Sequence, residues 1–169
     1  MMEAEENVAR EDGVVVQEPQ STPPNVLERY FKTSIFTYQR TKHDDEYLCE
    51  DILVAQHSNL LYVTFLADTH SLVQRRQQVA EVKPVKWDPD SVHGKRKKGG
   101  RNVQPRTIIG TITTQDGAEY LIPAGVQGSL VEWNWRLLSE PELLQNKQKT
   151  EGYIAVILPK RKPSYWKQP

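Results

Sequence analysis

The sequence is poor in the residues that build covalent cross-links and metal sites. It contains one cysteine, Cys49, and four histidines among its 169 residues. It therefore cannot form an internal disulfide, and its scattered histidines cannot supply a Cys/His zinc cluster at finger-like spacing. A lone free thiol is typical of proteins from reducing compartments, so we expect the nucleus or the cytoplasm.

Long apolar runs are also absent. No run approaches the roughly 20 residues that span a bilayer. The acidic segment from Met1 to Gln20 lacks the positive and apolar regions of a signal peptide. We therefore expect no membrane association.

The chain has no net charge, since 22 Lys and Arg residues balance 22 Asp and Glu residues. No global field steers it toward nucleic acid, so an electrostatic function has to come from local segregation of charge. Such segregation is present, with an acidic N-terminus and a basic middle and C-terminus. The cations that we select as candidates for partner binding or nuclear import are Lys95, Arg96, Lys97, Lys98, Arg101, Lys160, Arg161 and Lys162.

The run from Lys95 to Arg101 allows three interpretations. It is a solvated loop, an import signal, or a direct contact with an acidic protein surface or nucleic acid. Short basic runs are common, so the pattern alone does not decide among them. The neutral net charge and the lack of clustered aromatic residues nearby argue against nucleic acid.

Catalytic motifs are missing as well. The chain contains no Gly-rich phosphate loop, no GxSxG elbow and no HExxH pattern. Cys49, Asp51 and His57 lie close in sequence, and a thiolate nucleophile needs a base and an orienting acid. On a strand, Cys49 and Asp51 share a face roughly 7 Å apart, with His57 at the turn beyond. We expect a buried structural cysteine, turn or surface positions for His57 and His70, and no enzymatic activity.

Composition divides the chain into an arm, a domain and a tail. Residues 1–24 are acidic and poor in large apolar groups, which predicts a disordered arm. Residues 25–160 hold the apolar patterns of one domain. They are interrupted at 87–104 by a segment rich in Gly and Lys, which predicts a long basic loop. Residues 161–169 form a basic tail.

The apolar patterns within the domain predict strands with short connections. Asn25 can cap a short helix, and Asn59 can adopt the left-handed conformation of a tight turn. The pair Asp116-Gly117 predicts a type I′ hairpin. Strands are expected within 48–67, 107–122, 130–135 and 153–158, with at most one helical turn at 141–144. Many short strands and no long helix indicate an all-β barrel or sandwich with a short N-terminal helix and disordered termini.

Two tryptophans mark a candidate partner contact. In an extended strand, Trp133 and Trp135 fall on the same face, opposite Leu130 and Asn134. Such a pair is most often part of a core, but a partly exposed Trp is a natural interface anchor. We therefore include Trp135 among the candidate partner-binding residues.

The segment from Val126 to Leu158 resembles small lipoyl-carrier barrels of the glycine-cleavage H-protein type. Its landmarks are a Gly before a short strand, an Asn that ends the strand, a Pro-Glu-Leu step, and a Gly-aromatic pair that opens a last apolar strand. The resemblance implies a barrel-sandwich hybrid. A carrier presents one Lys at the tip of the preceding hairpin, and the hairpin from Thr113 to Tyr120 has none.

A second resemblance covers nearly everything from Leu27 to Lys160. The stretches LERYF, CED, QHSN, LADTH, GKRKKG and TEGYIAVILPK occur in the order and spacing of the Abitram family, actin-binding transcription modulators also called Simiate. The family's longer C-terminal extension is replaced here by a short basic end. The acidic arm is not part of the family pattern.

The family resemblance implies a non-enzymatic protein without a carrier lysine or cofactor. It implies binding of actin monomers or filaments, regulation of actin polymerization and of filopodia and neurite dynamics, and a pool in nuclear speckles that modulates transcription. The implied locations are the nucleus, the cytoplasm and actin-rich protrusions. The alternative is an adaptor or chaperone-like subunit for another assembly factor, such as one in translation factor biogenesis.

Overall fold

The computed structural model describes residues 25–42, 44–87 and 99–160, whose regular elements are mostly β-strands. The predicted acidic arm, most of the predicted basic loop and the basic tail lie outside the described residues. The described part contains every predicted strand region.

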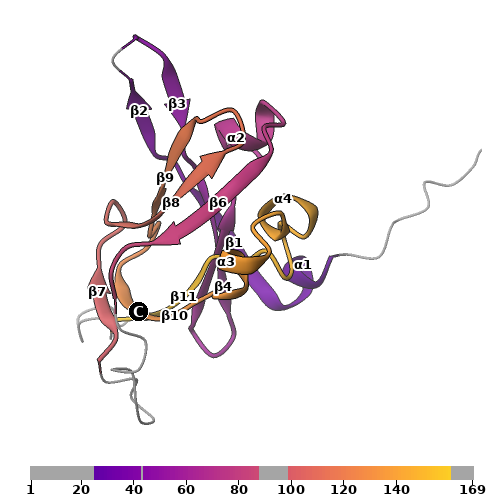
Figure 1. The fold of residues 1–169 in the computed structure, drawn as a ribbon. Coiled ribbons are helices and arrows are strands. Elements are labelled where there is room, and N and C mark those ends of the chain that lie inside the picture. Colours follow the sequence, from indigo (N-terminus) through magenta and orange to yellow (C-terminus); the bar gives the residue numbers. More distant parts are fainter. Residues whose placement is uncertain (1–24, 43, 88–98, 161–169) are drawn as a thin grey trace, which may run out of the picture.

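The larger of the two main sheets has six antiparallel strands. In spatial order they are β1 (Phe31–Phe36), β4 (Ile52–His57), β5 (Tyr62–Leu66), β11 (Ala155–Pro159), β10 (Gly128–Trp133) and β7 (Arg101–Val103). This order brings the C-terminal strand β11 between two strands that are distant in sequence (Figure 1). β7 lies inside the predicted loop at 87–104, so that loop prediction is wrong at its C-terminal end. The β-branched Val103 pairs with Gly128, and its burial holds the segment in the sheet.

The smaller main sheet has three antiparallel strands, β6 (Val79–Pro84), β8 (Ile108–Thr114) and β9 (Glu119–Pro123). A hairpin joins β8 to β9 at the predicted place, with a different turn. Gly117 has φ +85°, whereas Asp116 has no positive φ. The N–H of Gly117 donates to Thr114, and that of Thr114 donates to Ala118. The loop therefore has three residues, with glycine in the left-handed position.

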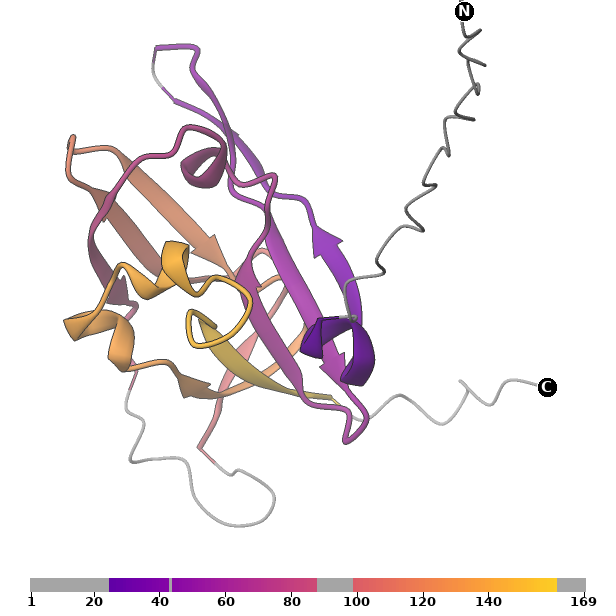
Figure 2. The ribbon, with the colours of Figure 1, turned by 90° about the vertical axis from the view of Figure 1, so that its right-hand side faces the viewer.

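A separate two-stranded ribbon, β2 (Gln39–Thr41) and β3 (Tyr47–Cys49), projects from one end of the molecule (Figure 1). The described residues also form four short helices: α1 (Val26–Tyr30), α2 (Ser71–Gln74), α3 (Arg136–Ser139) and α4 (Leu143–Asn146). The predicted Asn25 cap is confirmed, because its side chain accepts from the N–H of Leu27 and Glu28 completes a capping box. Figure 2 shows α3 and α4 together on one side and α1 beside β1 and β4.

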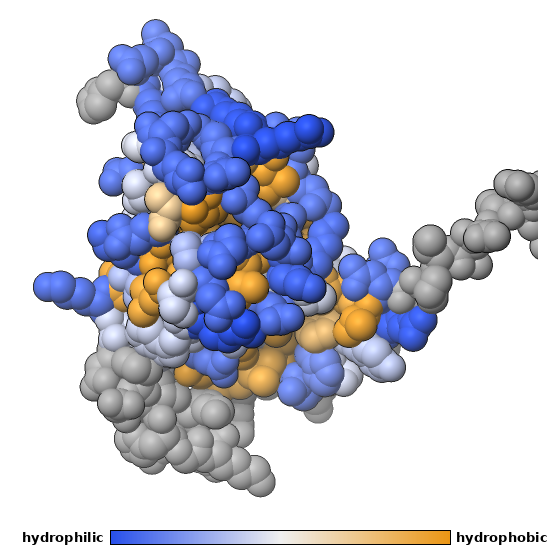
Figure 3. Space-filling model, turned by 45° about the vertical axis from the view of Figure 1, so that its right-hand side comes forward, coloured by the Kyte–Doolittle hydropathy of each residue, from blue (hydrophilic) through white to orange (hydrophobic). Residues whose placement is uncertain are grey.

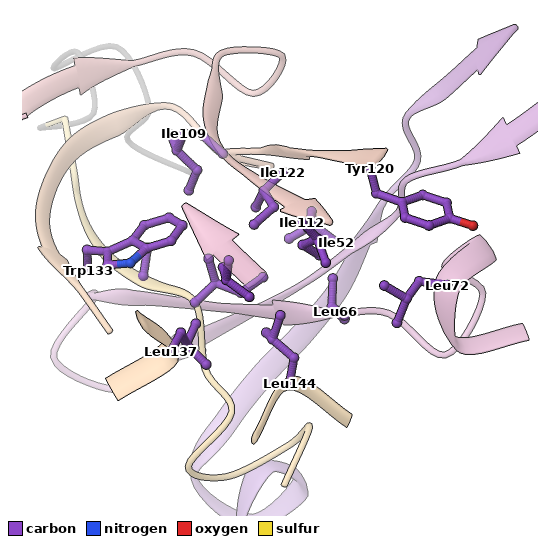
Figure 4. Close-up of a cluster of buried hydrophobic side chains, with 14 of the residues drawn as sticks. Ile52, Leu66, Leu72, Ile109, Ile112, Tyr120, Ile122, Trp133, Leu137 and Leu144 are labelled. Carbon is purple, nitrogen blue, oxygen red and sulfur yellow. The ribbon is translucent and has the colours of Figure 1, made fainter. Parts of the chain in front are cut away.

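The main core lies between the two sheets. Buried side chains from both sheets meet there, among them Ile52 and Trp133 of the larger sheet and Ile112 of the smaller one, with Leu144 of α4 closing one side (Figure 4). A second, smaller cluster of Leu27, Ala55 and Phe65 lies under α1. The face shown in Figure 3 is mostly hydrophilic, with apolar areas between the hydrophilic groups. Two sheets around one core make the predicted all-β, barrel-sandwich architecture.

Candidate protein-binding surface

Trp135 stands at the edge of an open groove, whereas its neighbour Trp133 is in the core. The exposed fractions of the two residues are 41% and 1%. The predicted shared face is therefore wrong: β10 ends at Trp133, and Trp135 immediately precedes α3. The groove has a volume of about 630 Å³ and is lined by Glu132, Trp133, Asn134, Trp135, Arg136, Thr150, Glu151 and Tyr153.

Asn134 produces the turn that separates the two indoles. Its side-chain amide donates to the carbonyl oxygens of Glu151 and Tyr153, both at 2.8 Å. Its side-chain oxygen accepts from the N–H of Arg136 at 3.3 Å. Because Asn134 is 2% exposed, these bonds are shielded from water and fix the change from strand to helix. They hold Trp135 outside the core.

The polar walls of the groove are held by their own contacts. Arg136 lies 2.8 Å from Glu151 and 3.2 Å from Glu140. The hydroxyl of Tyr153 donates to Glu132 at 2.6 Å. Burial and this hydrogen bond to Glu132 raise the pKa of Tyr153 to about 12, so the hydroxyl stays protonated at neutral pH.

This arrangement is suited to holding a protein side chain rather than to catalysis. A half-exposed indole offers a large rigid apolar surface, and Leu138 beside it on α3 is 51% exposed. Glu132 and Glu151 outnumber Arg136 in the groove wall, so the groove favours an apolar group that carries a positive or hydrogen-bond-donating end. Trp is among the residues that most often dominate interface energies.

Of the basic candidates, Lys160 is described and lies away from Trp135. β10 and β11 pair so that Trp133 is opposite Ala155 and Gly128 is opposite Pro159. Lys160, directly after Pro159, therefore lies at the other end of this pair from Trp135. The candidates outside the described residues are Lys95, Arg96, Lys97, Lys98, Arg161 and Lys162.

Arg101 differs from its predicted place on a free loop. It begins β7 and pairs with Leu130, and it is only partly exposed. Its Nη1 atom is buried without a hydrogen-bond partner among the described residues. A cation held in this way is a poor candidate for following a partner's surface.

The carboxylate of Asp51 and the backbone of Cys49 make hydrogen bonds within the fold. The carboxylate of Asp51 accepts from the N–H of Tyr38 at 3.0 Å and from the hydroxyl of Thr69 at 2.7 Å. The N–H of Cys49 donates to the hydroxyl of Ser71 at 2.8 Å. The predicted structural role of this segment agrees with these contacts, although Cys49 is half-buried rather than buried.

His70 corrects a prediction, because it is fully buried and not at a surface turn. Its Nδ1 atom accepts from the N–H of Leu72 at 3.1 Å, which caps α2. Burial lowers the pKa of His70 to about 4, and the nearby charge of Asp51 opposes the shift only in part. The imidazole is therefore neutral at physiological pH. Sequence reasoning missed it because an Asp-Thr-His-Ser stretch is typical of both exposed turns and helix caps.

In the described part of the chain, no group of three or more His, Cys, Asp or Glu side chains could hold a metal ion. No helix among the described residues is long and apolar enough to cross a bilayer.

Comparisons with known proteins give consistent relatives. Protein Abitram of Xenopus tropicalis is 35% identical over 145 residues, which cover 81% of this chain and 75% of the relative. Protein Abitram of Gallus gallus is 40% identical over 118 residues, 66% of this chain and 68% of the relative. Protein Abitram of Dictyostelium discoideum is 33% identical over 144 residues, 85% of this chain and 81% of the relative.

A solved structure is also similar. A glycine cleavage system H protein from Mycobacterium marinum matches with a TM-score of 0.49 and 12% sequence identity, over 72% of this chain and 83% of that chain. No family model matches the sequence. The sequence relatives are sufficient by themselves, since their identities extend over most of both chains: the chain belongs to the Abitram family.

Proposed function

We propose that the chain is a non-enzymatic actin-binding protein that regulates actin polymerization and filopodia and neurite dynamics. A nuclear pool, in speckles, modulates transcription, and the remainder is found in the cytoplasm and in actin-rich protrusions. Membership in the Abitram family carries this proposal, since the family resemblance implies these roles.

The groove at Trp135 supports a binding role and supplies its anchor. Trp135 and Leu138 form an exposed apolar surface, and the contacts of Asn134 and Arg136 fix its shape in advance. A prearranged anchor loses little conformational entropy on binding. The basic run from Lys95 to Lys98 adds a second contact to acidic actin surfaces and acts in nuclear import.

Cosedimentation with actin filaments and a monomer-binding assay test the proposal with the purified full chain. Trp135→Ala is expected to weaken binding by about 2 kcal/mol, roughly 30-fold in Kd. Tyr47→Ala is the matched control, because Tyr47 is also an exposed aromatic residue but lies on the β2–β3 ribbon. It should bind like the unaltered chain. Absence of binding at tens of micromolar would remove actin as a direct partner.

The second candidate is an adaptor or chaperone-like subunit for another assembly factor, such as one in translation factor biogenesis. The groove at Trp135 would serve this function as well, because the exposed indole can also contact a folded partner other than actin. Affinity purification from the native cell distinguishes the two functions. One stoichiometric partner other than actin, lost with Trp135→Ala, supports the adaptor.

Two further roles are tested separately. Replacing Lys95, Arg96, Lys97 and Lys98 with Gln should abolish nuclear accumulation. Unchanged accumulation would show that this run is not the import signal. A carrier role through an unexpected lysine would appear as a lipoyl or biotinyl adduct in the intact mass. We expect no adduct, since the hairpin from Thr113 to Tyr120, where a carrier would present its lysine, has none.

A further inference from the structure

We propose that β1 is an open sheet edge that binds an extended, acidic segment of a partner protein as an added strand. This second surface goes beyond the proposed function and does not depend on Trp135. It rests on the backbone of β1, on the contrast with the other sheet edges, and on the charge around α1.

The backbone hydrogen bonds of β4 alternate between its two neighbouring strands, and this alternation determines which backbone groups of β1 point away from the sheet. In antiparallel pairs, alternate residues bond to alternate neighbours. The N–H of His57 donates to Leu61 at 2.9 Å, and the N–H of Ala67 donates to Asp51 at 3.2 Å. Odd-numbered residues of β4 therefore bond toward β5, and even-numbered ones bond toward β1.

The register between β4 and β1 shows which residues of β1 bond to β4. Ser34 is opposite Val54, so the even-numbered residues of β1 bond to β4. The odd-numbered residues Phe31, Thr33 and Ile35 direct their backbone groups away from the sheet. The N–H of Phe31, which follows the last residue of α1, donates to the C=O of Leu27. The N–H and C=O groups of Thr33 and Ile35 have no partner within the described part of the chain.

The edge at β9 is closed by side chains in the place of a strand. The N–H of Leu121 donates to the Glu50 carboxylate at 2.7 Å. Arg40 donates to the C=O of Glu119 at 3.3 Å, and Arg40 and Glu50 pair at 2.7 Å. The ion pair thus covers an N–H and a C=O that are two residues apart, as a neighbouring strand would.

The edges at β6 and β7 offer less free backbone. At the start of β6, the amide of Gln145 accepts from the N–H of Val79 at 3.2 Å and donates to the C=O of Gln77 at 2.5 Å. β7 is only three residues long, and short edge strands offer little to pair with. β1 has six residues, four of them exposed, and no such cover from the described residues. An open edge of this length can accept an additional strand.

The side chains beside the edge indicate which residues a partner strand presents. Ile35 is opposite Leu53, on the face of the small cluster under α1. Ile35 is 54% exposed, and Val26 and Tyr30 of α1 are 59% and 61% exposed. Figure 3 shows apolar surface over α1. A partner with apolar residues at alternate positions would cover this face.

The charges near β1 favour an acidic partner. Arg29 and Lys32 line a groove of about 490 Å³ between α1 and the β4–β5 turn. Neither makes an ion pair with a described residue. The one carboxylate in this groove, that of Glu28, accepts from the N–H of Asn25 at 3.1 Å. These two cations, which have no ion-pair partner among the described residues, complement acidic residues that flank the added strand.

The test uses the full chain and a labelled peptide of alternating valine and threonine with glutamates at both ends. Fluorescence anisotropy measures its Kd beside that of the same peptide with lysines at both ends. The acidic peptide should bind at least about tenfold more tightly. No binding of the acidic peptide, or equal binding of the two, would overturn the proposal.

N-methylated peptides show whether the peptide binds through its backbone. One peptide is methylated at the valine nitrogens and another at the threonine nitrogens. Because alternate N–H groups of a strand point to opposite sides, only one of these two sets can face β1. One peptide should lose at least about tenfold in affinity, from two or more lost hydrogen bonds, and the other less than about twofold. Similar losses for both peptides contradict strand addition.

Substitutions at Thr33 test the edge from the protein side. Thr33→Pro removes an outward N–H without removing a bond to β4, and proline is tolerated on edge strands. It should abolish peptide binding, whereas Thr33→Val, which keeps the N–H, should retain it. Tight binding by a folded Thr33→Pro variant would exclude β1.

Other occupants of the edge have their own outcomes. If sedimentation shows a dimer that Thr33→Pro dissociates, a second copy covers β1 and the proposal fails. If changing Val14, Val15 and Val16 to Ser raises peptide affinity about tenfold or more, the chain's own N-terminal segment covers the edge and the proposal also fails.

Discussion

The indole of Trp133 packs directly on the backbone of Gly110. A Cβ atom built on Gly110 would lie 2.5 Å from Cη2 of Trp133 and 2.8 Å from the carbonyl oxygen of Lys83. Both are closer than van der Waals contact allows. The glycine in β8 therefore makes room for the largest fully buried side chain, which comes from the opposite sheet.

Gly110→Ala should destabilise the protein because it overpacks this contact. The expected loss in the free energy of unfolding is about 2–3 kcal/mol, measured by urea denaturation. Combining it with Trp133→Phe should give a loss smaller than the sum of the two single losses by about 1 kcal/mol, since the smaller ring leaves space. A loss below about 0.5 kcal/mol for Gly110→Ala would contradict the packing.

Local patterns predicted the secondary structure well where one residue decides the local geometry. The helix cap at Asn25 is of this kind, since its contacts involve near neighbours in sequence. The hairpin at Asp116 and Gly117 was predicted at the right place but with the wrong turn type, because only Gly117 has a positive φ. The strand regions were also predictable, because apolar alternation is imposed by the core. The H-protein resemblance narrowed the architecture to a barrel-sandwich hybrid, which periodicity alone left as a barrel or a sandwich. The order of the strands in the sheets was not predicted.

The site was less predictable because long-range contacts form it. Asn134 separates Trp133 from Trp135 only by bonding to carbonyls seventeen and nineteen residues further along the chain. Arg101 was placed on a loop because its pairing partner, Leu130, lies far away in sequence. The burial of His70 likewise depends on β9, since its ring lies 5.4 Å from that of Tyr120.

The stability of the protein should fall in mild acid because of His70. Its folded-state pKa is about 4, below the usual 6.5, so between these values the unfolded chain binds more protons than the folded one. The contribution of His70 is fully present above pH ~6.5 and is lost as the pH falls toward ~4. The expected loss by pH ~4 is about 3 kcal/mol.

Urea denaturation at a series of pH values measures this loss. His70→Asn provides the control, because the Asn side chain can still accept from the N–H of Leu72 but does not titrate. Its unfolding free energy should be lower at neutral pH and should fall less steeply between pH ~6.5 and ~4. Equal slopes for the two proteins would assign the acid sensitivity to other groups.

Removing the carboxylate of Glu50 should be strongly destabilising. Glu50 is fully buried, pairs with Arg40 and accepts from the N–H of Leu121. Glu50→Ala removes the acceptor of the N–H of Leu121 and of the partly exposed Arg40, whose side chain is 30% exposed. Losing these charge-assisted hydrogen bonds is expected to cost about 2–3 kcal/mol. Glu50→Gln keeps an acceptor and should cost less.

Thermal or urea unfolding measures both variants of Glu50. Glu46→Ala is the comparison at an exposed pair, because Glu46 and Arg75 have side chains 40% and 38% exposed. Its loss should stay below about 1 kcal/mol, as for most surface pairs. A loss from Glu50→Ala as small as that from Glu46→Ala would show that the buried pair is not important for stability.

The β4–β5 turn contains a residue in an unfavourable conformation. Leu60 has φ +73° and is 61% exposed, so its side chain gains little from packing. Asn59, which the sequence favoured for the left-handed position, instead accepts from the N–H of Leu61 at 3.0 Å through its side chain. A left-handed conformation disfavours residues that have a Cβ atom by roughly 1–2 kcal/mol.

Leu60→Gly should therefore stabilise the protein, by about 0.5–1 kcal/mol once the greater freedom of glycine in the unfolded chain is subtracted. Leu60→Ala is the matched control, because it removes the exposed side chain but keeps the Cβ atom, and its stability should stay near that of the unaltered chain. Urea denaturation compares all three proteins. If Leu60→Gly is less stable than Leu60→Ala, the turn carries no strain that glycine can relieve, and the leucine side chain contributes more than its exposure indicates.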